Sequence, residues 1–200
     1  MKRNTIFTLS LIIVGSLSFA ATRFAATSWN LDKTHSAVSF EVRHFFTSVP
    51  GAFEEYIANI AFDPQNLEES SLSVTIDVAS INTKNERRDG HLMTADFFEA
   101  EKYPNISFSS DKIVSTGDNT FEAHGKLTIK DVTTDFVMPF TLLGVMESPF
   151  QENTLIAGFT SEFNLLRSVY GVGTGDWVSD AVIGDEIKVK VDVEVNTPKN

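Results

Sequence analysis

Apolar and polar residues alternate along most of the chain, which is the pattern of β-strands that bury one face. The clearest rows lie in residues 36–44, 72–78, 120–129, 136–142, 155–165 and 187–195. Short turns separate them, such as Gly117-Asp118-Asn119 between two arms of an expected hairpin. About eight antiparallel strands joined in this way predict a sandwich or a barrel. The persistent apolar face favours a closed eight-stranded barrel, which can hold one small ligand.

The stretch 80–104 interrupts this alternation and predicts a short helical insert. Thr83 and Glu86 have the spacing of a capping box, so a helix is expected to begin there, and Pro104 ends the segment. On such a helix Arg88 shares one face with His91 and Leu92, and Phe97 follows. A cationic turn that carries imidazole and aromatic groups within a β-rich chain is expected to form a lid or rim over a cavity.

The first twenty residues have the composition of a secretory signal peptide. Lys2 and Arg3 precede an apolar run, 6–19, and small residues at 18 and 20 predict cleavage after Ala20. A membrane anchor is the alternative, but the run is shorter than the roughly 20 apolar residues that a span needs. We therefore expect residues 1–20 to be a signal peptide and residues 21–200 to form one domain.

The charge and the cysteine count narrow the class of protein. Loss of Lys2 and Arg3 would shift the formal net charge from −11 to −13, because no acidic residue lies in that segment. A chain this acidic is not expected to bind nucleic acid or anionic membrane surfaces. It contains no cysteine, which excludes disulfides, a thiol nucleophile and thiolate metal sites. An exported domain without disulfides fits the bacterial periplasm.

The expected interior is rich in phenylalanine, with seventeen Phe against three Tyr. Such a composition fits a greasy cavity lining that needs few hydroxyl partners. A solid core would have the same composition, so the sequence leaves both arrangements open.

Few side chains offer chemistry. No HExxH, GxSxG or phosphate-loop pattern occurs, and nothing calls for a cofactor or a metal. Ser36 and His44 share a strand face but lie about 26 Å apart along a straight strand, too far for a nucleophile and its base. His44 and Arg167 each come at the end of an inward-facing apolar row, and Arg88 and His91 lie on the expected lid.

Two interpretations of these polar residues stay open. In one, the arginines pair with Asp89 or Glu162 and the histidines satisfy loop carbonyls. In the other, the four form a head-group site at the mouth of a hydrophobic tunnel, since guanidinium and imidazole groups bind phosphate or amide oxygens. The full predicted ligand-binding set is Phe40, Val42, His44, Arg88, His91, Leu92, Phe97, Phe159, Phe163 and Arg167.

The chain resembles the YceI family over essentially all of residues 21–200. The opening motif is Trp29-Asn-Leu-Asp32, His35-Ser36, Val42-Arg43-His44 and Gly51-Ala-Phe53. The central motif is Arg88-Asp89-Gly-His91-Leu92, Asp96-Phe97-Phe98 and Tyr103-Pro104. The resemblance implies a lipocalin-like antiparallel barrel with a long internal pocket that binds polyisoprenoids, including quinones and prenyl pyrophosphates, or fatty amides. It also implies binding without established catalysis, and dimers are common among members.

Three positions depart from the family pattern. Asp131 replaces a glycine, Leu166 an asparagine, and Val169 an acidic residue. The last two changes remove polar groups near Arg167, which favours a less polar ligand, such as a quinone or a fatty amide, over a pyrophosphate.

These observations lead to three functional hypotheses. The first is a periplasmic carrier that sequesters or transports a long apolar ligand. The second is a lipid-modifying hydrolase or isomerase that uses His44 or His91 as base, which requires a nucleophile or an ordered water within hydrogen-bond reach of that histidine. The third is a binding module for another protein, such as a membrane redox protein, which requires a large exposed apolar patch outside the barrel.

Overall fold

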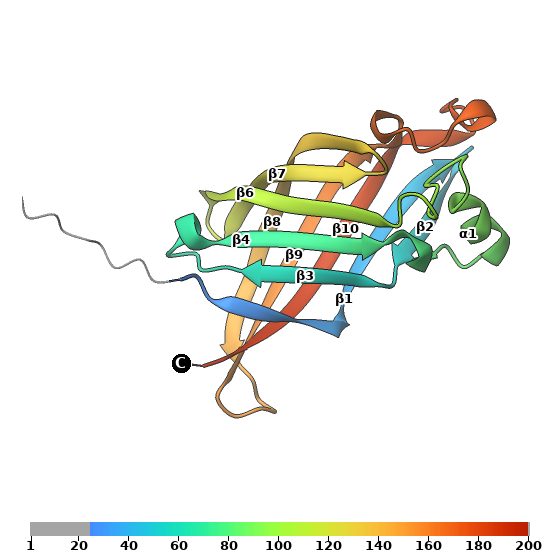
Figure 1. Cartoon of the computed structure of the whole chain (residues 1–200). Coiled ribbons are helices and arrows are strands. Elements are labelled where there is room, and N and C mark those ends of the chain that lie inside the picture. The colour runs from blue at the N-terminus through green and yellow to red at the C-terminus, as the bar shows by residue number, and fades with distance from the viewer. Residues whose placement is uncertain (1–24, 200) are drawn as a thin grey trace, which may run out of the picture.

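The computed structural model describes residues 25–199 and shows an antiparallel β-barrel with one short α-helix (Figure 1). The predicted signal peptide, residues 1–20, lies outside the described residues. The ten strands are β1 (Ser28–His44), β2 (Thr47–Phe53), β3 (Tyr56–Ala61), β4 (Ser71–Asp77), β5 (Ile81–Asn82), β6 (Asn105–Gly117), β7 (Thr120–Ile129), β8 (Val132–Glu147), β9 (Thr154–Leu166) and β10 (Ile183–Pro198). The α-helix is α1 (Glu86–Leu92), and 3₁₀ turns occupy η1 (Leu67–Glu69), η2 (Val78–Ser80), η3 (Arg167–Tyr170) and η4 (Gly175–Trp177). No helix among these residues is long and apolar enough to cross a membrane.

Pairing of the first and last strands closes the barrel. The sheet runs in the order β10-β9-β8-β7-β6-β4-β3-β1, and β10 pairs again with β1. These eight strands form the ring, which confirms the predicted eight-stranded barrel. β2 and β5 extend the sheet beyond β1 and were not foreseen. They fit because β1 changes partners: its first residues pair with β3, and residues 38–44 pair with β2.

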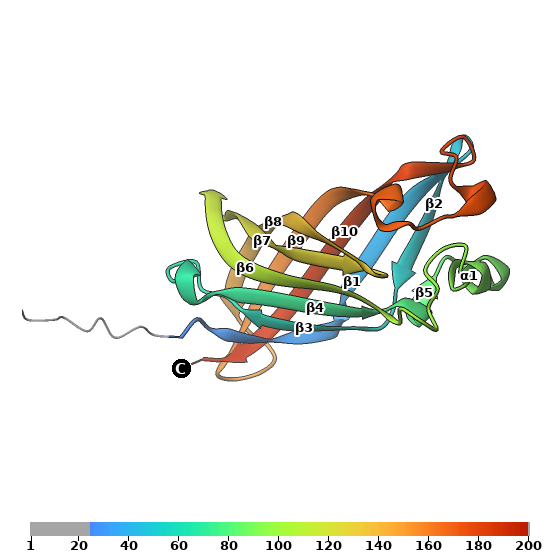
Figure 2. The ribbon, with the colours of Figure 1, turned by 45° about the horizontal axis from the view of Figure 1, so that its top comes forward.

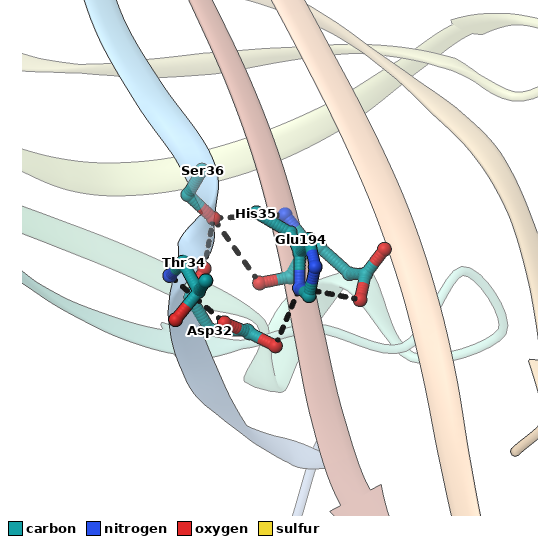
Figure 3. A network of polar contacts seen from close by, with 5 residues as sticks. All are labelled: Asp32, Thr34, His35, Ser36 and Glu194. Carbon is teal, nitrogen blue, oxygen red and sulfur yellow. Dashed lines mark hydrogen bonds and ion pairs between the residues drawn. The ribbon is translucent and has the colours of Figure 1, made fainter. Parts of the chain in front are cut away.

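This change of partner accompanies a bulge in β1. The register against β10 shifts between Asp32, which lies opposite Glu194, and Ala37, which lies opposite Asp192. Within the bulge His35 Nδ1 lies 3.0 Å from Asp32 Oδ2 and 3.6 Å from Glu194 Oε1 (Figure 3). The bulge therefore has its own hydrogen-bond network, which joins β1 to β10 across the irregular step.

The two ends of the barrel differ because of the order of the strands. One end carries the β1–β2 hairpin, the segment 78–104 with α1, the β7–β8 turn and the β9–β10 connection. The other end carries the start of β1, the end of β10 and the β8–β9 loop, as Figures 1 and 2 show. We call the first the mouth and the second the base.

Packed aromatic rings seal the base. Phe62 makes edge-on contacts with Phe121, Phe140 and Phe159 at centroid distances of 5.0, 5.5 and 5.4 Å. Trp29 donates its indole N–H to the Phe62 carbonyl at 3.0 Å. Some of the seventeen phenylalanines therefore form a solid plug at the base. The sequence left open a cavity lining or a solid core, and the barrel contains both, at different heights along its axis.

The helical insert lies at the mouth, but its predicted cap was wrong. Asn85 is the N-cap and accepts from the Arg88 backbone N–H, so the helix begins later than the capping box implied. The Thr83 hydroxyl instead contacts the Asp89 carboxylate, and Asp89 Oδ1 also accepts from the Thr83 N–H at 3.0 Å. The Asp89 carboxylate, one turn into the helix, therefore accepts the Thr83 N–H that a capping box assigns to Glu86, and the Thr83 hydroxyl donates to Asp89 rather than accepting from the Glu86 N–H.

The β1 bulge predicts a pH dependence of stability. The hydrogen bond to Asp32 raises the pKa of His35, and the charges of Asp32 and Glu194 add to this effect. The same bond lowers the pKa of Asp32. The His35 contribution is complete below its ordinary value of 6.5 and is lost as the pH rises through its raised folded value. The Asp32 contribution is complete above 3.8 and is lost as the pH falls through its lowered folded value.

We therefore expect His35→Gln to lower the melting temperature most at about pH 5.5 and least at about pH 8.5. Thermal denaturation at the two pH values measures the difference from the unsubstituted protein. His124→Gln, which removes an outer-face histidine away from the bulge, is the control. A His35→Gln deficit of equal size at both pH values would contradict this account of the bulge.

Candidate functional site

A cavity of about 700 Å³ occupies the barrel between the aromatic plug and the mouth. Its wall comes from the inward rows of all eight ring strands, with further residues from β2 and β5, and most of the lining side chains are aliphatic or aromatic. All ten residues of the predicted ligand-binding set line it. Their role in binding stays a prediction, but the sequence placed them correctly on one surface.

The pairing register of β10 with β1 and β9 determines which side chains meet in the middle of the cavity wall. Val189 of β10 lies opposite Phe40 of β1 on one side and Phe163 of β9 on the other. Gly51 of β2 makes room for the Phe40 ring, because a Cβ at Gly51 would lie 2.3 Å from Phe40 Cζ. Val42 lies one inward position nearer the mouth, and Phe159 lies deeper, against the plug. This part of the wall therefore consists of hydrocarbon and rings.

The insert forms one side of the mouth. The Phe97 side chain is buried, and its ring and that of His91 both contact Trp177 of η4, at centroid distances of 5.8 and 5.2 Å. The Thr174 N–H donates to the Asp96 carbonyl at 2.8 Å, which joins the insert to the β9–β10 connection. Leu92 is half-buried beside this contact. The expected lid is therefore a rim built from two segments far apart in sequence.

Arg167 is buried and holds the β9–β10 connection in place. Its guanidinium donates to the carbonyls of Gly184, Val172 and Ile183 at 3.0, 2.9 and 2.9 Å. Gly173 packs against it with a φ of +91°, and a Cβ at that position would lie 2.1 Å from Arg167 Nη1. Three of the five guanidinium N–H groups are thus bound within the protein.

Arg88 is similarly engaged on the insert. It is half-buried, and its Nε and Nη2 donate to the Thr83 hydroxyl and carbonyl at 2.7 and 2.6 Å. Glu162, the other acid proposed as an arginine partner, lies near Lys190 instead. The interpretation that the arginines pair with Asp89 or Glu162 is therefore wrong: Arg167 holds three backbone carbonyls, and Arg88 holds the hydroxyl and the carbonyl of Thr83.

The two candidate histidines differ in their surroundings. His91 Nε2 lies 2.8 Å from Asp96 Oδ2, so a carboxylate orients the ring rather than the loop carbonyl that one interpretation assigned. His44 is exposed at the end of β1, and its ring contacts Phe45 edge-on at 4.7 Å. Two hydroxyl groups on the cavity wall donate to protein oxygens rather than to a histidine: the Thr83 hydroxyl donates to the Asp89 carboxylate, and the Ser161 hydroxyl donates to the Pro139 carbonyl. This arrangement offers an oriented imidazole without an adjacent nucleophile.

A carboxylate, Asp185, holds the outer side of the rim through hydrogen bonds to Ser168. Asp185 accepts from the Ser168 hydroxyl at 2.7 Å and from the Ser168 N–H at 2.9 Å. These bonds lower the pKa of Asp185, and the positive charge of Arg167 acts in the same direction. The acid thereby ties η3 to the first residues of β10 from outside, as Arg167 does from inside.

Among the described residues, one group of three side chains has the spacing of metal ligands. The ligand atoms of Asp32, His35 and Glu194 lie within 4.8 Å of one another on the outer face of the β1 bulge. They hydrogen-bond and pair with each other, as described above, and they lie outside the cavity wall.

Sequence reasoning missed part of the rim. Tyr170, Val172 and Trp177 line the cavity, and none of them belongs to the predicted ligand-binding set. Trp177 carried a usable signal, because a large aromatic residue between glycines and acids in a loop is usually packed against something.

Comparison with known proteins places this architecture. Residues 29–195 match the YceI-like domain. BcnA of Burkholderia cenocepacia is 29% identical, and its crystal structure covers 82% of this chain and 99% of its own with a TM-score of 0.75. The Campylobacter jejuni YCEI protein is 34% identical, with 85% and 98% covered and a TM-score of 0.70. A polyisoprenoid binding domain from Saccharophagus degradans shares the fold at 13% identity, with 86% and 98% covered and a TM-score of 0.60.

The clamp on the β9–β10 connection generates a stability prediction. Arg167→Met keeps the length of the side chain but leaves the carbonyls of Val172, Ile183 and Gly184 without their donor. We expect the free energy of unfolding to fall by about 2–4 kcal/mol, since bonds from charged donors contribute most when buried. Urea denaturation measures the loss. Arg87→Met, at an exposed position of α1, is the matched control and is expected to cost less than about 0.5 kcal/mol. Equal losses in the two variants would show that the hydrogen bonds of Arg167 to the β9–β10 connection do not contribute to the free energy of unfolding.

Proposed function

The chain belongs to the YceI-like domain family, and we propose that it is a non-enzymatic carrier that encloses a long apolar molecule within its barrel. The observation that carries the proposal is the 700 Å³ cavity, closed at its base by packed rings and open towards a rim of polar groups. A site of this size suits one extended ligand. A protein of the same fold is a polyisoprenoid binding domain, which supports an isoprenoid tail as one ligand class.

Burial of the tail supplies the affinity. Each CH₂ group that leaves water contributes about 0.8 kcal/mol, so ten such groups give about 8 kcal/mol before the costs of ordering the chain. The wall around Phe40, Phe163 and Val189 offers apolar contacts, which do not require a particular orientation of the ligand as hydrogen bonds do. We therefore expect selection for tail length and shape in the barrel, and for the head group only at the rim.

The rim favours an uncharged or weakly polar head group. Arg88 and Arg167 already donate to protein oxygens, and His91 already contacts Asp96. A pyrophosphate would have to compete for these donors, whereas a quinone or an amide needs one or two hydrogen bonds. A quinone or a fatty amide is thus the proposed ligand class.

We further propose that the carrier acts in the periplasm, after removal of residues 1–20. The basic start, the apolar run and the small residues near Ala20 support export, and a chain without cysteine does not depend on disulfide formation there.

Filling the cavity tests the carrier function directly. Val189→Trp places an indole between Phe40 and Phe163, where a tail would lie, and we expect at least a tenfold loss of affinity for a long-chain quinone, roughly the burial of two CH₂ groups. Binding is measured by quenching of tryptophan fluorescence, with melting temperature as a check on folding.

Lys188→Trp is the matched control, because Lys188 is exposed on the outer face of the same strand. This variant carries the same added indole and is expected to bind as the unsubstituted protein does. Equal affinity of a well-folded Val189→Trp variant would rule out the barrel interior as the binding site.

The head-group assignment has its own test. We expect a quinone and a fatty amide to bind at least about tenfold more tightly than a prenyl pyrophosphate of matched tail length, because Arg88 and Arg167 are engaged and only the exposed Arg87 remains among the arginines that line the cavity. Competition against one fluorescent long-chain probe gives the three affinities on one scale. Tighter binding of the pyrophosphate would show that the arginines leave their protein partners for the ligand.

A further inference from the structure

We infer that the tip of the β1–β2 hairpin inserts into the surface of a zwitterionic lipid bilayer. This inference rests on the proposed carrier function, since it names the surface at which the cavity is loaded and emptied. We call the side chains of Phe45 and Phe46, the two residues of the hairpin loop, the apolar tip.

The hairpin loop places phenylalanine where turns of this kind favour glycine or asparagine, and it exposes the rings to solvent. His44 pairs with Thr47, so Phe45 and Phe46 alone form the loop. Phe45 has a φ of +50°, a conformation in which two-residue loops normally place glycine or asparagine. Phe46 is 99% exposed and Phe45 is 48% exposed. Strained backbone and an exposed ring at the same turn are typical of a functional surface rather than of packing.

The tip is continuous with the cavity mouth. The Phe45 N–H donates to the Val182 carbonyl at 2.8 Å, which fixes the hairpin against the segment before β10 (Figure 2). Val178 and Val169 of the β9–β10 connection are 64% and 49% exposed. His44 and Trp177, the immediate neighbours of Phe45 and Val178 in the chain, line the cavity. A surface that receives the tip would therefore face the opening through which a tail passes.

The polar groups of the hairpin are suited to an apolar environment. Arg43 donates to the Phe45 carbonyl at 2.8 Å and also contacts the Asp180 carbonyl, so the loop backbone finds partners inside the protein. Residues 42–53 contain no Asp or Glu, although the chain as a whole carries 27 acidic residues. Entry of the hairpin loop into the interfacial region of a bilayer thus costs little in unsatisfied backbone groups or charge, whereas the exposed Asp176 and Asp180 of the β9–β10 connection stay in the aqueous head-group layer.

The shape of the tip favours a bilayer over a protein partner. A stable protein interface needs roughly 800 Å² per partner and complementary packing. The apolar tip consists of two aromatic side chains on one hairpin loop, which a lipid surface can accept without a complementary pocket. Because the net charge is −11 for the full chain and −13 without residues 1–20, neutral lipids are the matching surface, and anionic lipids are expected to weaken the association.

Vesicle flotation tests the inference. We expect the unsubstituted protein to float with phosphatidylcholine vesicles, and Phe46→Ser to reduce its partition coefficient by about tenfold or more. Phe46 is almost fully exposed, so its loss leaves the fold intact. The double variant F45G/F46S removes both rings and also relieves the positive φ, and its melting temperature confirms that the barrel persists.

The chain provides its own control at the base. Phe150 is 92% exposed on the β8–β9 loop, and Phe150→Ser removes an equivalent ring from the opposite end. We expect this variant to float as the unsubstituted protein does. Absence of flotation of the unsubstituted protein, an equal loss in the two variants, or full flotation of F45G/F46S would overturn the inference and leave a protein partner for this surface.

A second readout separates this inference from the carrier function. Quinone binding from solution, without vesicles, is expected to be unchanged in Phe46→Ser, whereas quinone transfer between vesicles is expected to slow about tenfold. If the unsubstituted protein floats but binds no long-chain ligand, the carrier function fails and the bilayer contact stands. If it binds ligand in solution and does not float, the bilayer contact fails alone.

Discussion

Pairing of β1 with β10 is the constraint on which the whole molecule depends. It turns a sheet that would otherwise end in two open edges into a ring, and it forces every inward side chain towards one axis. Along its length β1 changes partners from β3 to β2 on one side while it stays paired with β10 on the other, and the bulge between Asp32 and Ala37 lies between the two partners. The network around His35 therefore stabilises the step at which the barrel is joined.

Once the ring is closed, the placement of large side chains decides what lies inside it. Phenylalanines crowd the base and seal it, whereas the middle of the wall leaves a volume that no side chain fills. The mouth stays open because Arg88 and Arg167 hold its backbone at the sides and do not reach across it. The same barrel is thus a packed core at one end and a container in the middle.

Much of this architecture could be predicted because the two faces of a strand appear in the sequence as alternating apolar and polar residues. The rows through Val38–Val42, Phe159–Leu165 and Ile187–Val195 gave the strands, their inward faces and the wall residues. The mouth residues were also placed correctly on the cavity, since they come at the ends of inward rows or on the one non-β segment. The cavity itself could not be predicted, because a hollow and a solid interior need the same side chains.

What the sequence could not give depends on contacts between distant segments. Nothing local indicates that Thr174 donates to Asp96, that Trp177 packs on His91, or that Arg167 binds three carbonyls. β2 was missed because Pro50 and Gly51 interrupt the alternation that marked the other strands. The positive φ at Phe45 was equally hidden, since no residue type that favours this conformation is present.

Native mass spectrometry of the protein, purified gently from its source and kept free of detergent, tests the central claim most directly. The account predicts one bound long-chain molecule per barrel, released as an uncharged quinone or amide when the protein is denatured. An empty barrel that also refuses added long-chain quinones and fatty amides would show that the hollow interior is not a binding site.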